Sequence, residues 1–338
     1  MQKFKNRNYL RKIDNTSNIV SSMLASIEHL VATNADSSQF IDTIHKFVSI
    51  APLSLASYVA PGTKLFRATN HHTSLPQNIH ELWYPPEEKS SLGRANYKGQ
   101  SVFYCSSDPS CVFHEIGTQL GNLVVLATWA TTEQMLLHEI GYSDKVLTRA
   151  ESRRRLPKRH KTFNTRLNPE HRKIREQLFL AFTEPTSTKY ALTAAIAEVF
   201  LRADEIAGIM YPAVSKFGNV DNLAIRPQFV HTGLRLKEAQ LVKVDTIGTD
   251  KSIGGEILFD LSSVGEDGTL SWVRRDSGRP IQPKESIEIP PGFSEHALSD
   301  VEIEVDGLRY SIKAGYLLEN NASGFSVRDL RGDLVNPL

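Results

Sequence analysis

The sequence has little cysteine and no histidine-rich or acidic motif with the spacing of metal ligands. Its 338 residues include two cysteines, Cys105 and Cys111, which form no C-x-x-C pair. This argues against a disulfide framework and is typical of a protein in a reducing cytoplasm. The adjacent His71 and His72 have no acidic or cysteine partner at ligand spacing, so we predict no metal site.

Net charge and long hydrophobic runs are also scarce. There are 39 lysines and arginines against 38 aspartates and glutamates, a formal net charge of +1. This balance gives no reason to expect nucleic acid as a partner. The basic start, MQKFKNRNYLRK, precedes no continuous apolar segment, so the sequence predicts neither a signal peptide nor a membrane span.

The N-terminal region, residues 1–60, shows apolar residues at helical spacing between 18 and 48, with a break near 34–38. This spacing predicts two amphipathic helices. Either the helices are a structural cap on the following domain, or they present a surface for dimerisation or for a partner. Pro61-Gly62 then marks the approach to the first strand of the core.

Residues 101–117 predict a strand, a turn and a helix. The β-branched and aromatic run at 101–105 favours a mostly buried strand. Asp108 followed by Pro109 is typical of a helix start, because the aspartate oxygen can accept from an unpaired backbone N–H. Glu115 then lies about two turns into the helix, at the edge of its apolar face. Packing can position a carboxylate there without burying it completely.

Two arginines lie near this segment in the sequence. Arg67 belongs to a predicted strand at 64–68, where a guanidinium needs an anionic partner. Arg94 lies in a Gly-Arg-Ala-Asn loop, close to Tyr104. Two guanidiniums, a tyrosine and a glutamate are the groups needed to hold a pyrophosphate and to stabilise a sugar cation beside it. The alternative is a buried ion pair between Arg67 and Glu115 that joins strand to helix.

The remaining pattern mixes helices with strands. We predict strands at 122–130, 206–211 and 222–225, helices at 171–183 and 190–202, and short strands with a hairpin at 301–312 after residue 247. Trp83 and Tyr84 either form a wall for a flat heterocycle or pack in the core. The basic segment from Arg149 to Arg175 is a solvated loop, a guide for an anionic ligand or acidic partner, or an RNA contact.

Six motifs occur in an order that resembles the RES-domain family. They are LFRA, LWYPPEEKSSLGRAN, SVFYCSSDPSCVFHEIG, YALTAAIAEVF, GIMYPAV and DNLAI, within residues 62–228. The resemblance implies an α+β fold with an ADP-ribosyltransferase-like mixed sheet at 61–246, between the N-terminal helices and a β-rich appendage at 247–338. It also implies a toxin that consumes NAD and pairs with a Xre-type antitoxin protein.

The resemblance also implies roles for seven residues. Those implied to be catalytic are Glu115, Arg67 and Tyr104, and those implied to bind the substrate are Arg94, Tyr211, Ser215 and Asn222. For Tyr211 and Asn222, the residues alone more often indicate a structural polar role. Ala213 departs from the family pattern, which usually has serine after Tyr-Pro, and Ser215 is the nearby residue that can replace it.

NAD is then a substrate and no cofactor is expected. The acceptor stays open: inorganic phosphate gives phosphorolysis, water gives hydrolysis, and a side chain of a macromolecule gives ADP-ribosylation. A non-catalytic NAD-binding module is a further alternative, because of Ala213.

Overall fold

The computed structural model of the chain describes residues 21–50, 54–70, 74–143, 166–213, 215, 220–248 and 252–275, together with five strands between 294 and 328. The chain divides into two compact units, residues 1–275 and 276–338. Three features of the sequence lie outside the described residues: the histidine pair at 71–72, the basic residues before 166, and residues 287–289, where the apolar pattern also predicts a short strand.

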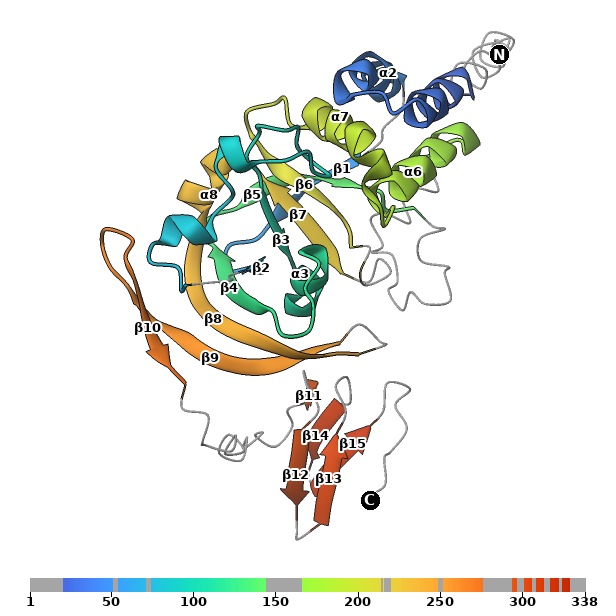
Figure 1. Cartoon of the computed structure of the whole chain (residues 1–338). Coiled ribbons are helices and arrows are strands. Elements are labelled where there is room, and N and C mark those ends of the chain that lie inside the picture. The colour runs from blue at the N-terminus through green and yellow to red at the C-terminus, as the bar shows by residue number, and fades with distance from the viewer. Residues whose placement is uncertain are drawn as a thin grey trace. The chain divides into compact units, whose positions relative to one another are not determined.

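The first unit is built on one ten-stranded sheet, whose strands are labelled in Figure 1. Its order is β1-β5-β6-β7-β3-β2-β4-β8-β9-β10. Only β5 and β6 are parallel neighbours, so the sheet is mixed, and the α+β prediction is confirmed. The likeness to ADP-ribosyltransferases stays a prediction. The strands are β1 (Ser54–Val59), β2 (Lys64–Asn70), β3 (Phe103–Ser106), β4 (Leu123–Thr131), β5 (Met135–Ile140), β6 (Ile206–Pro212), β7 (Asp221–Ile225), β8 (Leu234–Ile247), β9 (Ile253–Val264) and β10 (Leu270–Arg274).

The helices begin where the sequence predicts. Asp108 caps the helix over 109–115, and its Oδ1 accepts from the backbone N–H groups of Ser110 and Cys111 at 2.9 and 3.0 Å. Asn168 caps a second helix in the same way. Among the described residues, no helix has the length and hydropathy needed to cross a membrane. Besides residues 21–32, the helices are α2 (Ser37–Ile50), α3 (Pro109–Glu115), α6 (Pro169–Phe182), α7 (Tyr190–Phe200) and α8 (Pro227–Gly233), with short 3-10 turns η1 (Ile79–Leu82), η2 (Glu87–Lys89) and η3 (Ser187–Lys189).

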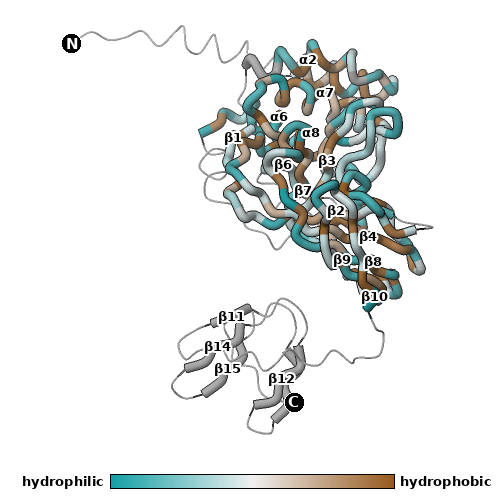
Figure 2. Tube along the Cα trace, turned by 90° about the vertical axis from the view of Figure 1, so that its left-hand side faces the viewer, coloured by the Kyte–Doolittle hydropathy of each residue, from teal (hydrophilic) through white to brown (hydrophobic). Residues whose placement is uncertain are grey.

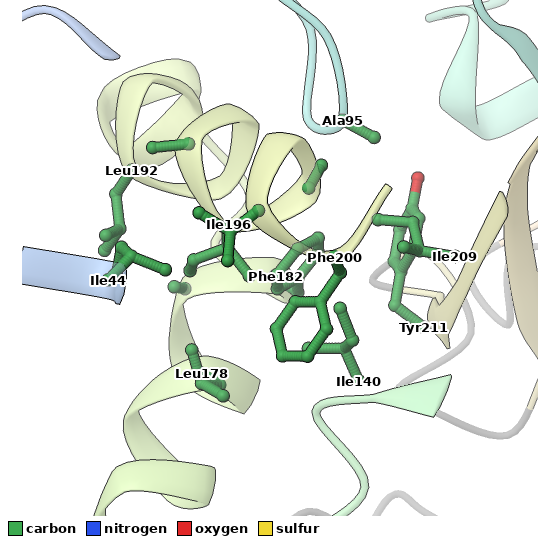
Figure 3. Packing of buried hydrophobic residues seen from close by; sticks show 14 of the residues in the cluster. Ile44, Ala95, Ile140, Leu178, Phe182, Leu192, Ile196, Phe200, Ile209 and Tyr211 are labelled. Atoms are coloured by element: carbon green, nitrogen blue, oxygen red, sulfur yellow. The ribbon is translucent and has the colours of Figure 1, made fainter. Parts of the chain in front are cut away.

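The N-terminal helices pack against the sheet unit and share its largest hydrophobic cluster. Ile44 of α2 is fully buried against Leu192 and Ile196 of α7 (Figure 3). Phe40 and Ile44, one helical turn apart on α2, are both buried, and hydrophilic residues occupy other positions of the helix, as an amphipathic helix requires (Figure 2). This packing supports the structural-cap alternative, and a surface for dimerisation or for a partner stays a prediction. The predicted break between them lies at Asn34, which has a positive φ of 51°.

The second hydrophobic cluster includes the loop that precedes β3. Trp83 packs against this cluster, and the centroid of its ring lies 4.3 Å from the ring centroid of His231 in α8. The Tyr84 hydroxyl lies 2.5 Å from Nε2 of the same histidine. Of the two alternatives for Trp83 and Tyr84, the structure supports packing in the core.

Two parts of the sheet differ from the predicted domain organisation. β1 belongs to the sheet, although residues 1–60 were predicted to be helical. Its SLASYV sequence is too short to give a clear period. β9 and β10 also belong to this sheet, because β8 pairs with β9 along most of its length. Assigning them to the C-terminal appendage was wrong, since a change in local composition does not show which strands pair.

The part of the second unit that the structure describes consists of five short strands. β12 (Val301–Val305) and β13 (Leu308–Ile312) pair as the predicted hairpin, with Val305 opposite Leu308. The other sheet is made of β11 (Ser294–His296), β14 (Leu317–Asn321) and β15 (Gly324–Arg328).

The packing of α2 predicts the effect of one core substitution. Ile44→Ala should lower the free energy of unfolding by about 2–5 kcal/mol, because it leaves a cavity between α2 and α7. Urea denaturation followed by circular dichroism measures this change. The control is Leu120→Ala, whose side chain is 62% exposed and should change the stability little. Equal stabilities for both variants would contradict the packing described for α2.

Candidate functional site

The site forms where the sheet is interrupted between β2 and β3. These neighbouring strands pair at a single position, Phe66 opposite Ser106. Beyond it, Arg67 Nη1 donates to the carbonyl oxygen of Tyr104 at 2.9 Å, so a side chain bridges the strands where the backbone ladder stops. A cavity of about 280 Å³ opens there.

Six of the seven residues predicted for the site line this cavity. They come from β2, β3, β6, β7, the end of α3 and the loop before β3, and they are Arg67, Arg94, Tyr104, Glu115, Tyr211 and Asn222. Their roles in binding or catalysis stay predictions.

Arg67 is held at the bottom of the interruption. Its guanidinium carbon lies 5.2 Å from the centroid of the Phe103 ring, and its Nε is buried without a hydrogen-bond partner. Burial lowers the pKa of Arg67 to about 10, which leaves the guanidinium charged at neutral pH. Arg67 lines the cavity, so its positive charge would attract an anion there.

Arg67 does not form the ion pair with Glu115 that the structural alternative requires, because its Nη1 is bonded to Tyr104. Glu115 is exposed at the last residue of α3. The helix dipole favours cations at that end, so a carboxylate there gains nothing from the helix. The helix therefore does not explain a carboxylate at this position, and we expect the reason to be an interaction of Glu115 within the cavity.

Arg94 has a larger structural role than expected. Its Nη1 and Nη2 donate to the carbonyl oxygens of Phe182 and Glu184, each at 3.0 Å, and it is only 7% exposed. These carbonyls lie at the end of α6, where backbone oxygens lack partners within the helix. The guanidinium also lies 4.9 Å from the Tyr190 ring centroid. Arg94 therefore joins the loop before β3 to the start of α7, and only part of its donor set is left for a ligand.

The Tyr104 hydroxyl is already engaged within the protein, and the catalytic role of Tyr104 stays a prediction. The hydroxyl donates to Asn96 Oδ1 and accepts from the backbone N–H of Ala95, both at 2.7 Å. Gly93 allows this close packing, since a Cβ there would lie 2.3 Å from Asn96 Oδ1 and 2.7 Å from the Tyr104 hydroxyl oxygen. Only the ring of Tyr104 is left to contact a ligand.

Ser215 does not line the cavity but contacts Glu115 from behind. Its Oγ donates to Glu115 Oε1 at 3.4 Å and lies 3.1 Å from Cys111 Sγ. Cys111 Sγ also donates to Asn222 Oδ1 at 3.4 Å. The residue predicted to replace the missing serine thus lies beside the carboxylate, and its contact with substrate stays a prediction.

The thiols of the site are poor nucleophiles. Burial raises the pKa of Cys111 to about 11, and burial also raises the pKa of Cys105, which lines the cavity. Both thiols therefore stay protonated at neutral pH, and the thiolate is the reactive form. Among the described residues, no group of three or more potential metal ligands lies together.

Tyr211 and Asn222 face each other across β6 and β7. The ring centroids of Tyr211 and Phe182 lie 5.2 Å apart, and the Tyr211 hydroxyl points toward the loop of Ala95 (Figure 3). Both residues therefore combine a structural role with a place at the cavity wall.

The match to a family model covers residues 64–244, and the model describes the RES domain. The chain belongs to the RES-domain family. No curated protein and no solved structure matches the chain. The RES region begins with β2 and ends within β8, so it contains every residue of the cavity wall.

Sequence reasoning missed three residues of this RES-domain cavity. Asn96 is next to Arg94 in the motif, and its burial at 3% exposure marks it as the organiser of the loop. Tyr190 is the first residue of an ordinary helix, so the sequence gives no sign that it belongs to the cavity. Its contact with Arg94 in the structure shows that it does. Lys89 has no signal of its own within the charged EEK run.

The engaged hydroxyl of Tyr104 predicts a stability effect. Tyr104→Phe leaves the Ala95 N–H and the Asn96 oxygen without this partner, so the free energy of unfolding should fall by about 1–3 kcal/mol. The matched control is Tyr97→Phe, because the Tyr97 hydroxyl is buried without a partner and its loss should cost nothing. Chemical denaturation of both variants is the measurement, and an unaffected Tyr104→Phe protein would contradict the network.

Proposed function

We propose that this protein cleaves the nicotinamide–ribose bond of NAD. The observation that carries the proposal is one cavity, in a RES domain, whose wall holds both the guanidinium-bearing side chain of Arg67 and the exposed carboxylate of Glu115. The first group suits a diphosphate or phosphate, and the second suits a ribose that becomes positively charged.

Cleavage of this bond needs little proton transfer. The electron pair of the bond leaves with nicotinamide, which departs as a neutral molecule, and the ribose carbon becomes an oxocarbenium-like centre. Negative charge near that carbon stabilises the transition state more than the ground state. In the proposed mechanism Glu115 supplies this charge, and Arg67 holds the anionic part of the substrate in place. An oxygen of phosphate or water then bonds to the ribose carbon, and water loses a proton in that step.

Ser215 positions the carboxylate in this proposal. Its hydrogen bond to Glu115 and its contact with Cys111 support a role from behind Glu115 rather than in the cavity. Although Ala213 stands where the family usually has serine, the hydroxyl of Ser215 then lies beside the carboxylate. We extend the proposal to a toxin that a Xre-type antitoxin protein restrains, which is the role that the RES resemblance implies.

The decisive experiment separates the products of NAD by mass after incubation with purified protein, with and without inorganic phosphate. Nicotinamide with phosphorylated ADP-ribose indicates phosphorolysis, and nicotinamide with ADP-ribose indicates hydrolysis. Nicotinamide release that requires a lysate and labels a macromolecule indicates an ADP-ribosyltransferase. Intact NAD under all conditions contradicts cleavage, and measurable binding without turnover would identify a binding module.

Glu115→Gln should lower the rate of NAD cleavage by about 10²–10³-fold, because it removes the charge that stabilises the developing cation. The control is Glu88→Gln, an exposed glutamate that does not line the cavity and should leave the rate unchanged. The rate of nicotinamide release measures both. Equal rates for the parent and Glu115→Gln would remove Glu115 from the mechanism.

Ser215→Ala should reduce kcat by about 3–10-fold with little change in KM for NAD, since it removes one long hydrogen bond from a hydroxyl to the Glu115 carboxylate. Ser110→Ala serves as control: it loses a bond to Asp108 at the other end of α3 and does not contact Glu115. A larger change in KM than in kcat for Ser215→Ala would instead indicate direct contact with the substrate.

A further inference from the structure

Three cationic side chains line the cavity, and they differ in what they already bind. Arg94 donates to two backbone carbonyls. Arg67 donates to one through Nη1, and its buried Nε has no hydrogen-bond partner. Lys89 is the third. Among the residues that the structure describes, none forms a hydrogen bond or an ion pair with its ammonium group. Lys89 therefore brings a positive charge with all its donors available.

The backbone beneath Lys89 is fixed, although its side chain is exposed. The backbone N–H of Lys89 donates to Pro86 O at 3.0 Å and closes η2. The next residue, Ser90, is buried, and its hydroxyl donates to Gln100 O. The carbonyl oxygen of Pro85, just before η2, accepts from the Ser101 hydroxyl at 2.6 Å. The attachment point is thus rigid, while the four-carbon stem can move its ammonium group over the cavity mouth.

The charges near Lys89 favour an anion that arrives from outside. Glu87 and Glu88 share η2 with Lys89, but neither lines the cavity. Within the cavity wall Glu115 is the one carboxylate among the described residues, and three cationic side chains line the same cavity. A ligand with a phosphate group would therefore be attracted to the side of the cavity that carries Lys89, and its ribose would remain free to meet Glu115.

We propose that Lys89 is a specificity-determining residue that binds a phosphate group at this cavity. The inference rests on the proposed function for the identity of the whole ligand, and it adds a residue to which neither the family match nor the RES motifs give a role. The phosphate can come from two sources, the diphosphate of NAD or the inorganic phosphate that attacks the ribose. The two sources give different kinetic results.

The test compares Lys89→Ala with the parent on NAD and on nicotinamide riboside, which has no phosphate, at several concentrations of inorganic phosphate. If Lys89 binds the diphosphate, KM for NAD rises about tenfold with kcat unchanged, and the riboside shows no effect. If Lys89 binds the acceptor, the KM for inorganic phosphate rises with both substrates. Lys89→Arg should retain most of the affinity, because it keeps the charge.

The control is Lys98→Ala, an exposed lysine near the same loop that does not line the cavity. It should match the parent in every assay. Values of KM for NAD and for inorganic phosphate within twofold of the parent in Lys89→Ala would overturn the proposal.

A binding measurement keeps the test independent of turnover. Calorimetric titration with ADP and with inorganic phosphate should show weaker binding to Lys89→Ala than to the parent and to Lys98→Ala. The loss should shrink as salt is added, because the ammonium group is exposed. If the parent does not cleave NAD, a loss of affinity in Lys89→Ala still supports the phosphate site, and equal affinities overturn it.

Discussion

The candidate site depends on the interruption of the sheet between β2 and β3. A continuous antiparallel pair would bond these strands through their backbones and leave no cavity between them. Here one register position joins them, and Arg67 bonds the Tyr104 carbonyl where the ladder ends. The same interruption that opens the cavity therefore buries a guanidinium at its base, so the shape of the site and its charge have one structural cause.

The loop before β3 is held in place by a few side chains that each make several contacts. Tyr104 extends from β3, and its hydroxyl bonds Ala95 and Asn96, while Gly93 leaves room for this contact. The Asn96 amide nitrogen donates in turn to loop carbonyls, at 2.8 Å for Ser91 and 2.7 Å for Tyr97. Arg94 ties the loop to α6 and α7. Residues that a motif groups as one ligand-binding set thus divide into those that build the wall and those left to meet a ligand.

The electrostatics of the cavity place one carboxylate opposite several cations. Glu115 lies at a helix end that does not favour negative charge, and Ser215 donates to it from behind. The buried thiols stay neutral. This arrangement suits an anionic substrate that develops positive charge at a neighbouring carbon, because each end of such a molecule meets the opposite charge.

The sequence by itself determined the local elements: Asp108 and Pro109 begin α3, Asn168 begins α6, and the apolar spacing yields the N-terminal helices. These features depend on neighbours a few residues away, so a single sequence carries them. The ordered motifs also sufficed for the family and for six of the residues that line the cavity.

Only the tertiary structure decided which strands pair, and with them the wall of the site. It placed β1, β9 and β10 in the main sheet, and it brought Ser215 to Cys111 and Arg94 to the end of α6. These contacts join segments about a hundred residues apart in the chain. No local period or capping residue encodes such a partner, because its choice depends on how all the buried faces fit together.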